Sequence, residues 1–202
     1  MPVRKSSVTF PLTVARLYRY PYPMESVQKS LENYRLLVAR VDVLCNGIIA
    51  AFHPHITCNK GCDSCCRHLS LFPVEGVALA AAVAELPADA AAYLRQRAGE
   101  AAADGPCPLL MGGQCLLYAA RPLICRTHGL PILTMEAETR RVDFCPSNFT
   151  GLASLPGEAV IHLDRLNASL AAVNAHFTAH GYRSLPPGTE RLTIAEALLL
   201  KL

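Results

Sequence analysis

The chain has 202 residues, of which 51% are hydrophobic and 17% are charged, and its formal net charge is +3. That length suffices for one sizeable domain, whereas so small and evenly spread a charge argues against nucleic-acid binding. No apolar run reaches the roughly 20 residues that a membrane-spanning helix needs, so we expect no membrane association. The basic start at Met1–Lys5 is followed by Pro11, Arg16 and Arg19, which break the apolar core that a signal peptide requires.

Nine cysteines are the most informative part of the composition. Their odd number, the lack of an export signal and the adjacent pair Cys65-Cys66 argue against a disulfide framework. We therefore expect a cytoplasmic protein in a reducing environment, with thiols free to bind metal. Thiolates are the soft ligands that zinc and iron–sulfur centres prefer.

The first quarter of the chain predicts an arm and a long helix. Prolines in residues 1–23 favour an extended N-terminal arm. From residue 24 to about residue 52, apolar residues recur at steps of three and four, which predicts one amphipathic helix. Cys45 lies on this apolar stripe, so we expect it in the core and not at a metal.

Two alanine-rich helices are predicted next. The first begins at Pro73, which suits the first turn of a helix, and runs to about Leu86. The second runs from Ala88 to Ala103, where Asp104-Gly105-Pro106 stops it. Alanine on every face allows these helices to pack closely against their neighbours.

Residues 106–146 lose this periodicity and become rich in Gly, Pro and Cys. Cys115–Tyr118 favours a short strand, and Pro122–Arg126 favours one helical turn. Ile132–Met135 and Arg141–Phe144 are typical of a β-hairpin. The cysteines of this segment are therefore expected in turns and loops.

The C-terminal part predicts two further helices. One amphipathic helix runs from Gly157 to about His180, and a linker follows at residues 185–188. Thr193 and Glu196 have the spacing of a capping box, which predicts a terminal helix.

The fold class that these elements indicate is mainly α, with amphipathic helices around an irregular cysteine-rich metal-binding core and a small β-hairpin. The expected organisation is an arm at residues 1–23, one helical domain at 24–182 with its cysteine core at 58–146, and a linker with a helix at 183–202.

The densest group of cysteines reads C-N-K-G-C-D-S-C-C from Cys58 to Cys66. Cys58, Cys62 and Cys65 put three thiols on one tight loop, which Gly61 allows to curl, and one distant thiolate would complete a four-ligand shell. Cys66 follows Cys65 directly and cannot easily reach the same ion. It either binds a second centre, binds another atom of a cluster or remains a reactive thiol. The eight candidate metal ligands are Cys58, Cys62, Cys65, Cys66, Cys107, Cys115, Cys125 and Cys145.

Eight thiols are enough for two four-cysteine sites, or for one such site with further cysteines that do not bind its metal. The basic residues that neighbour them in sequence are Lys60, Arg67, Arg121 and Arg126. These residues either offset the charge of the thiolates or form ordinary solvated surface, and for Arg126, directly after Cys125, we favour a functional role. His68 and His128 are either ligands or structural residues, and the structural role is favoured because four-thiolate sites need no imidazole.

These motifs resemble the YkgJ-type cysteine-cluster family, which is described as a zinc- or iron-chelating domain with a CxxCxxCC core and with flagellin N-methylases among its relatives. The matching segments are Cys58–Cys66, Cys107–Leu110, Gly113–Tyr118, Arg121–Arg126 and Cys145–Pro146. The resemblance implies metal chelation by these cysteines and implies little about a substrate. The first gap has three residues here and two in the family label, so the match is firmest at Cys62, Cys65 and Cys66.

The spacing Cys58-x3-Cys62-x2-Cys65 also equals that of the cluster loop in radical S-adenosylmethionine enzymes. Those enzymes carry the loop on a β/α barrel, and this sequence shows no alternation of strands and helices. The coincidence still indicates that such a loop can hold a 4Fe-4S cluster, which favours iron over zinc.

Three functional hypotheses follow. The favoured one is a protein with a 4Fe-4S cluster, or iron, that acts in electron transfer or as accessory to a protein-modification reaction. In the second, Zn²⁺ holds the loops of an interaction module without catalysis. The flagellin-methylase relatives imply the third, an S-adenosylmethionine-dependent N-methylase. A protein partner is expected, and no catalytic residue is assigned because no hydrolase triad, phosphate loop or dinucleotide motif is found.

Overall fold

The computed structural model describes residues 24–58, 61–136, 139–180, 185–186 and 188–202. The predicted arm at residues 1–23 and much of the predicted linker lie outside the described residues. Within the described part the chain is mainly α-helical with small sheets, which confirms the predicted fold class.

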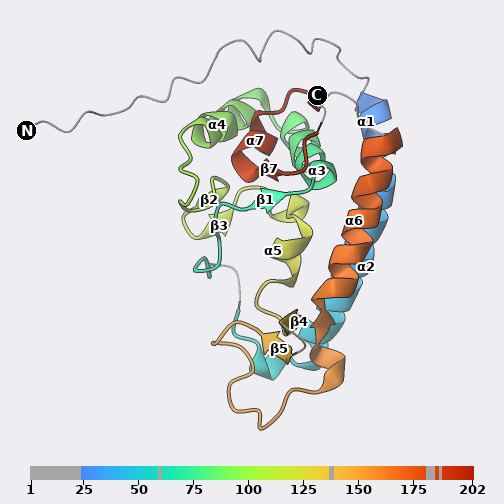
Figure 1. Cartoon of the computed structure of the whole chain (residues 1–202). Coiled ribbons are helices and arrows are strands. Elements are labelled where there is room, and N and C mark those ends of the chain that lie inside the picture. The colour runs from blue at the N-terminus through green and yellow to red at the C-terminus, as the bar shows by residue number, and fades with distance from the viewer. Residues whose placement is uncertain (1–23, 59–60, 137–138, 181–184, 187) are drawn as a thin grey trace, which may run out of the picture.

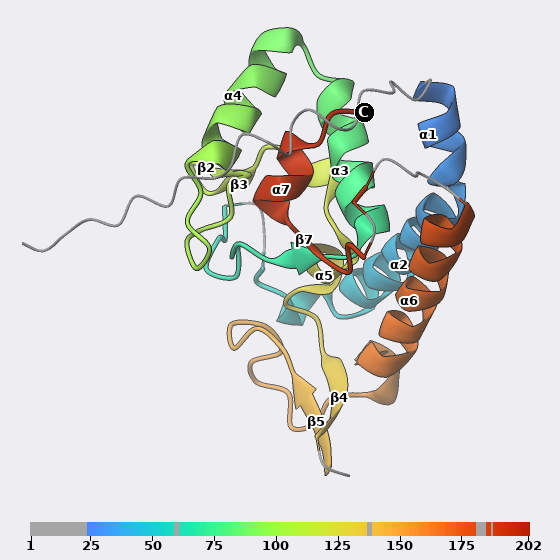
Figure 2. The same cartoon turned by 45° about the horizontal axis from the view of Figure 1, so that its top comes forward.

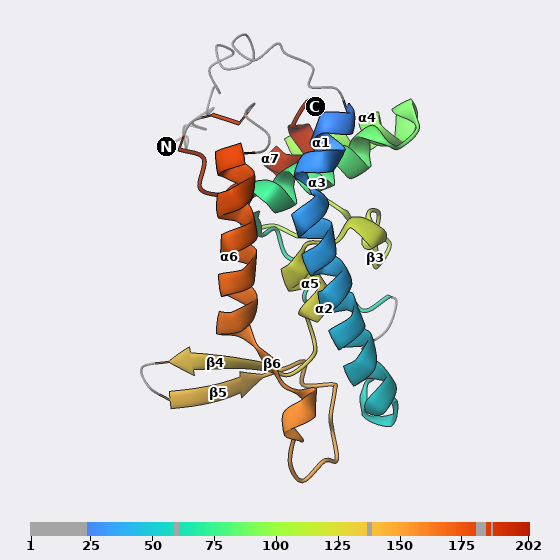
Figure 3. The ribbon, with the colours of Figure 1, turned by 90° about the vertical axis from the view of Figure 1, so that its right-hand side faces the viewer.

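The predicted N-terminal helix is confirmed as α1 (Met24–Ser30) and α2 (Glu32–Ala51), which follow one another almost without a break at Leu31. The predicted stripe faces inward, and Cys45 on it is 4% exposed. α6 (Leu163–His180) runs alongside α2 and packs against it (Figures 1 and 3). These helices enclose a first hydrophobic core, whose buried members include Val27, Tyr34, Ile48, Leu170 and Phe177.

A second hydrophobic core forms where α7 (Ile194–Leu199) packs against α3 (Pro73–Ala84) and α4 (Ala88–Gly99) (Figure 2). Both alanine-rich helices are confirmed, although α4 ends at Gly99, before the predicted Ala103. The capping box is also confirmed, because the Glu196 N–H donates to Thr193 Oγ1 at 3.1 Å and the Thr193 N–H donates to the Glu196 carboxylate at 2.7 Å. The buried members of this core include Leu79, Leu94, Leu109, Ile194 and Leu198.

Short strands tie distant segments together. β1 (Ser70–Leu71) pairs antiparallel with β7 (Leu192–Thr193), which the sequence did not predict. The predicted hairpin is confirmed as β4 (Ile132–Glu136) and β5 (Thr139–Asp143), and it projects beyond the lower end of α6 (Figure 3).

The predicted helix from Gly157 is wrong in its first turn and a half. Gly157–Ala159 forms a 3-10 turn, and β6 (Ile161–His162) then pairs parallel with β4. Two adjacent β-branched residues, Val160 and Ile161, fit the helical stripe and a strand equally well, and pairing with β4 decides for the strand.

The predicted strand Cys115–Tyr118 is wrong beyond its first residue. β2 (Leu110–Met111) and β3 (Gln114–Cys115) form a tight hairpin, and Tyr118–Ala120 is a 3-10 turn. The predicted helical turn after Pro122 is confirmed as α5 (Leu123–Thr127). None of the described helices has the length and apolar character needed to cross a membrane.

Candidate metal centre

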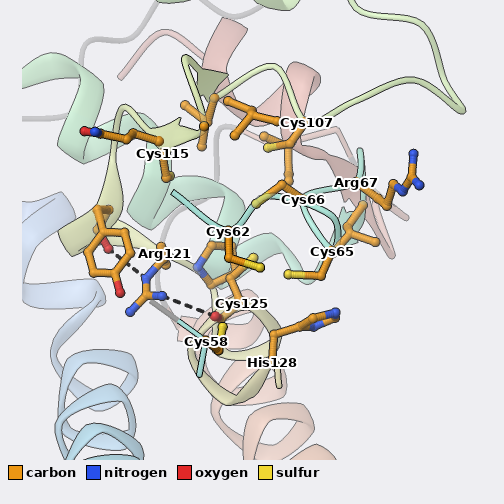
Figure 4. Close-up of a pocket in the computed structure, with 18 of the residues that line it drawn as sticks. Cys58, Cys62, Cys65, Cys66, Arg67, Cys107, Cys115, Arg121, Cys125 and His128 are labelled. Atoms are coloured by element: carbon orange, nitrogen blue, oxygen red, sulfur yellow. Dashed lines mark hydrogen bonds between the residues drawn. The ribbon is translucent and has the colours of Figure 1, made fainter. Parts of the chain in front are cut away.

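Seven of the eight predicted ligands line one cavity of about 420 Å³ (Figure 4). Its apolar wall is formed by side chains of Leu69, Leu109, Leu110 and Ile194, and no carboxylate is among the described residues that line it. Sulfur donors without carboxylates select soft metals rather than Mg²⁺ or Ca²⁺. The cysteines in the lining are Cys58, Cys62, Cys65, Cys66, Cys107, Cys115 and Cys125.

The loop that carries the first cysteines is shaped by tight turns. The Cys66 N–H donates to the Asp63 carbonyl at 2.8 Å, and the Arg67 N–H donates to the Cys65 carbonyl at 3.0 Å. Gly61 has a φ of +105°, a conformation that residues with a side chain rarely adopt. The loop therefore needs glycine at this point, as the sequence predicted.

The β2–β3 hairpin lies directly against this loop. A Cβ on Gly113 would come within 3.2 Å of the Gly61 carbonyl oxygen, and Gly113 has a φ of +74°. Only glycine permits both the turn and this close approach. The contact brings Cys115, at the end of β3, to the same cavity as the cysteines of the loop.

Cys107 is joined to the loop through the backbone. The Cys107 N–H donates to the Cys66 carbonyl at 3.2 Å. Arg97 on α4 fixes the following turn, because its guanidinium donates to the carbonyls of Pro108 at 2.9 Å and of Leu110 at 2.7 Å. The sequence analysis missed Arg97, which lies on a helix that showed no sign of chemistry.

Cys125 lies on α5, which two charged residues hold in place. The buried Glu75 carboxylate accepts hydrogen bonds from the N–H groups of Leu123 at 3.1 Å and Phe72 at 3.2 Å, so it caps α5 and α3 together. Burial raises the pKa of Glu75, although both hydrogen bonds act in the opposite direction. Arg126 binds both carboxylate oxygens of Asp42 on α2, at 2.7 and 2.9 Å.

The ion pair of Arg126 with Asp42 identifies Arg126 as a positioning residue. The Arg126 guanidinium also donates to the carbonyls of Arg121 at 2.7 Å and Ala119 at 2.6 Å, and its side chain is 8% exposed. Its charge is thus matched by a carboxylate, and its role is to hold the segment that carries Cys125 against α2.

Replacing Arg126 should therefore destabilise the protein. Arg126→Ala leaves two carbonyls and the Asp42 carboxylate without their donor, so we expect the free energy of unfolding to fall by about 2–4 kcal/mol. Arg40 is exposed on the same helix as Asp42, and Arg40→Ala should change it by less than about 0.5 kcal/mol. Denaturant unfolding measures both, and equal effects would contradict the positioning role.

Cys58 and Cys145 are brought together by Asn148, which is 1% exposed. Asn148 Oδ1 accepts from the N–H groups of Thr57 and Cys58, both at 3.0 Å, and its Nδ2 donates to the Gly129 carbonyl at 2.8 Å. The Asn148 N–H donates to the Cys145 carbonyl at 2.8 Å. Cys145, which is not among the residues lining the cavity, therefore lies beside Cys58. The sequence analysis missed Asn148.

Burial raises the pKa of five cavity thiols, and repulsion between neighbouring thiolates adds to the rise at four of them, Cys58, Cys66, Cys107 and Cys125. The pKa of Cys66 is raised to about 11, first by burial and then by Cys65, Cys107 and Cys115. The pKa of Cys125 is raised to about 12, first by burial and then by Cys107, Cys115 and Cys66, while Arg121 lowers it. Because gathered thiolates repel one another, a cation among them would stabilise their charged form.

Backbone N–H groups donate hydrogen bonds to two of these sulfurs. Burial raises the pKa of Cys107, and the N–H groups of Leu109 and Leu110 act against this rise by hydrogen bonding to it. Burial also raises the pKa of Cys115, which the N–H of Leu117 opposes in the same way. N–H groups directed at sulfur stabilise a thiolate and tune the metal bound to it.

Metal uptake should release protons. Burial raises the pKa of Cys66 to about 11 and that of Cys125 to about 12, so both are protonated at neutral pH. A metal binds the thiolate, so we expect each of these ligands to release about one proton on metal uptake. The apparent affinity should rise with pH at least to the pKa of about 11 of Cys66. Calorimetric titration of the metal-free protein in buffers of different ionisation enthalpy measures the count. Uptake without proton release would contradict thiol ligation, and Cys45→Ser should leave the count unchanged.

The histidines divide between structural and rim positions. His68 Nδ1 lies 2.8 Å from the Ala102 carbonyl, and its Nε2 accepts from the Ala195 N–H at 3.2 Å, which holds the N-terminus of α7. Both ring nitrogens of His68 are therefore engaged, which supports the structural role. His128 is exposed and contributes to the cavity lining.

Of the four basic residues, Arg67 and Arg121 line the cavity. The Arg121 guanidinium stacks on the Tyr118 ring at 3.6 Å and donates to the Cys125 carbonyl at 3.4 Å (Figure 4). Lys60 lies outside the described residues. Arg121 is thus the cation best placed to offset thiolate charge at Cys125 and Cys115, whose pKa values it lowers.

Among the described residues, no three Cys, His, Asp or Glu side chains stand close enough together to hold a single metal ion. The donor set nevertheless fits a thiolate-bound metal, because soft ligands gather in one cavity and backbone N–H groups face two of the sulfurs. The residues available to such a group are the seven lining cysteines and Cys145 beside them.

Comparison with known proteins identifies one family model that matches this chain. The model of the CxxCxxCC family, described as "Putative zinc- or iron-chelating domain", matches residues 57–146. This segment begins one residue before Cys58 and ends directly after Cys145, so it contains all eight predicted ligands. No curated protein and no solved structure matches the chain.

Proposed function

We propose that the protein holds an iron–sulfur cluster and acts in electron transfer or as accessory to a protein-modification reaction, starting from the match of residues 57–146 to the model of the CxxCxxCC family. The observation that carries this proposal is the cavity in which seven cysteines from separate segments converge. Metal binding is the property that family and cavity have in common.

The spacing of the thiols favours a cluster over a single ion. A tetrahedral zinc with Zn–S bonds of about 2.3 Å requires sulfurs only about 3.8 Å apart. No three candidate ligands among the described residues are gathered closely enough for one ion, and they line a cavity of about 420 Å³. A wider arrangement suits a group with several metal atoms, each of which takes its own thiolate.

The position of the loop suits electron exchange with a partner. Cys62 is exposed, whereas the other cavity cysteines are half-buried, so one edge of the site reaches the surface. When bound, an iron–sulfur cluster would supply one-electron redox chemistry. The contribution of this chain is to hold the thiolates, to offset their charge through Arg121 and to bury most of the site.

Anaerobic purification of the full chain tests this proposal. We expect a brown protein with visible absorption that bleaches on reduction, and with iron and acid-labile sulfide in equal amounts. A colourless protein that contains zinc and no sulfide would contradict the iron–sulfur proposal. If the protein is brown, redox titration of its visible band gives the reduction potential that an electron-transfer partner has to match.

Zinc as a folding staple is the second candidate, because the cysteines join the two hydrophobic cores. Cys107 and Cys115 pack against the second core. Cys58 is held by Asn148 next to Phe149, a buried member of the first core. A metal bridging these loops would stabilise the contact between both halves. Zinc at stoichiometric amounts, with cooperative unfolding on chelation, would support this candidate.

The S-adenosylmethionine-dependent N-methylase stays a prediction drawn from the resemblance alone. If this hypothesis is right, the metal-loaded protein binds S-adenosylmethionine saturably, which calorimetry can measure directly.

A further inference from the structure

We infer that the eight cysteines form two four-thiol metal sites side by side. The first site consists of Cys58, Cys62, Cys65 and Cys145. The second site consists of Cys66, Cys107, Cys115 and Cys125. This inference rests on the proposed metal binding and adds the number of centres and the ligands of each.

The first site is defined at one end by Asn148 and Gly129. Asn148 binds the backbone of Cys58 and of Cys145, as described above. A Cβ built on Gly129 would lie 3.6 Å from both Cys58 Sγ and Cys145 Cβ, so these two side chains flank the same glycine. Cys62 and Cys65 line the cavity together with Cys58, and the thiols that act electrostatically on Cys58 are Cys62, Cys65 and Cys145. All four members of the first site are thus neighbours.

The second site is built on the segment that follows. Cys66 and Cys107 are joined by a backbone hydrogen bond, and Arg67 and Pro106 form an antiparallel bridge beside them. The thiols that act electrostatically on Cys66 are its chain neighbour Cys65 and then Cys107 and Cys115 of the second site. Those that act on Cys125 are Cys107, Cys115 and Cys66, all of them from the second site.

The division falls between two consecutive residues, Cys65 and Cys66. Adjacent side chains cannot easily converge on one ion, and the turns at Cys66 N–H and Arg67 N–H separate these two. In the view of Figure 4, Cys62 and Cys65 lie next to one another, and Cys66 lies between them and Cys107. A hydrogen bond between the Cys65 and Cys66 thiols shows that the two sites are adjacent.

The two sites differ in their surroundings. The first contains Cys62, the exposed cysteine, whereas Cys107 and Cys115 of the second pack against a hydrophobic core. In the second site N–H groups also hydrogen-bond to the sulfurs of Cys107 and Cys115. The first site is therefore the accessible one, and the second is the one packed against a hydrophobic core.

Metal analysis of single and double cysteine variants of the full chain tests the division. Cys145→Ser and Cys62→Ser should each lose the same part of the wild-type metal, about half when both sites hold the same centre, and the double variant should lose no more. Cys125→Ser should lose the other part, and Cys145→Ser with Cys125→Ser should lose all of it. Cys45→Ser is the matched control and should keep the wild-type content. Native mass spectrometry, which weighs each bound group, provides the readout.

One shared centre predicts a different pattern, in which Cys145→Ser or Cys62→Ser alone removes all the metal. That result would overturn the two-site inference while leaving the proposed metal binding intact. Wild-type protein without any metal would instead overturn the proposed function. If Cys125→Ser proves insoluble, the first-site variants still decide, because they distinguish partial from complete loss.

Discussion

Cys62→Ser should remove the part of the metal that its own site holds and lower the free energy of unfolding of the protein by at least about 3 kcal/mol. Cys62 lies on a loop held by two backbone turns and the contact of Gly61 with Gly113. We expect these contacts to offset only part of the conformational entropy of the loop, and bound metal to supply the rest. A serine hydroxyl is a poor substitute for a thiolate at a soft metal.

The control for this experiment is Cys45→Ser, which should keep all the metal. Cys45 is buried on α2 and is absent from the cavity lining. Burial, followed by the Asp42 charge, raises its pKa to about 11, so it stays a neutral thiol in the core. Metal analysis and denaturant unfolding of both variants give the comparison. A Cys62→Ser protein with wild-type metal content would rule out this loop as part of the site.

Asn148→Ala should have the second largest effect, although its side chain carries no candidate ligand atom. The substitution removes three hydrogen bonds in a partly buried setting, leaves the N–H groups of Thr57 and Cys58 without their acceptor and takes one of two donors from the Gly129 carbonyl. At about 1–3 kcal/mol for each unsatisfied group, we expect a loss of about 3–5 kcal/mol. Metal should be lost from the site that contains Cys58 and Cys145, because Asn148 holds these two residues together.

Two further variants sharpen the Asn148 experiment. Asn148→Asp keeps the oxygen that accepts from Thr57 and Cys58 but loses the donor to Gly129, so its stability should fall between those of wild type and Asn148→Ala. Asn46 is exposed on α2, and Asn46→Ala should have little effect. Equal stability of Asn148→Ala and Asn46→Ala, measured by denaturant unfolding, would contradict the role assigned to Asn148.

Helices with a clear apolar stripe or a strong start signal could be predicted from the sequence. α2, α3 and α7 are examples, through the stripe that includes Cys45, through Pro73 and through the Thr193 capping box. These signals are local, so they survive without knowledge of the tertiary structure. The pairings of β1 with β7 and of β4 with β6 could not be predicted. Each of them involves only two residues on either strand, and each joins segments that are far apart in the sequence.

That the cysteines gather in one place could be predicted, while their role as ligands stays a prediction; the residues that position them could not be predicted. Seven thiols do line one cavity, as their spacing and the family resemblance suggested. Glu75, Arg97 and Asn148 act on backbone groups of distant loops, and a sequence gives no sign of such partners. Arg126 was marked for its position after Cys125, yet its partner Asp42 lies on another helix.

The most direct test measures hydrogen exchange in the loops around Cys62 and Cys107, together with metal content, before and after chelation. The chain must be purified under reducing, oxygen-free conditions. We predict that the native protein contains metal, that these loops are protected while it is bound, and that removing it abolishes their protection. A protein that is free of metal as purified, yet folded and equally protected in both loops, would contradict the conclusion that metal holds the cysteine core together.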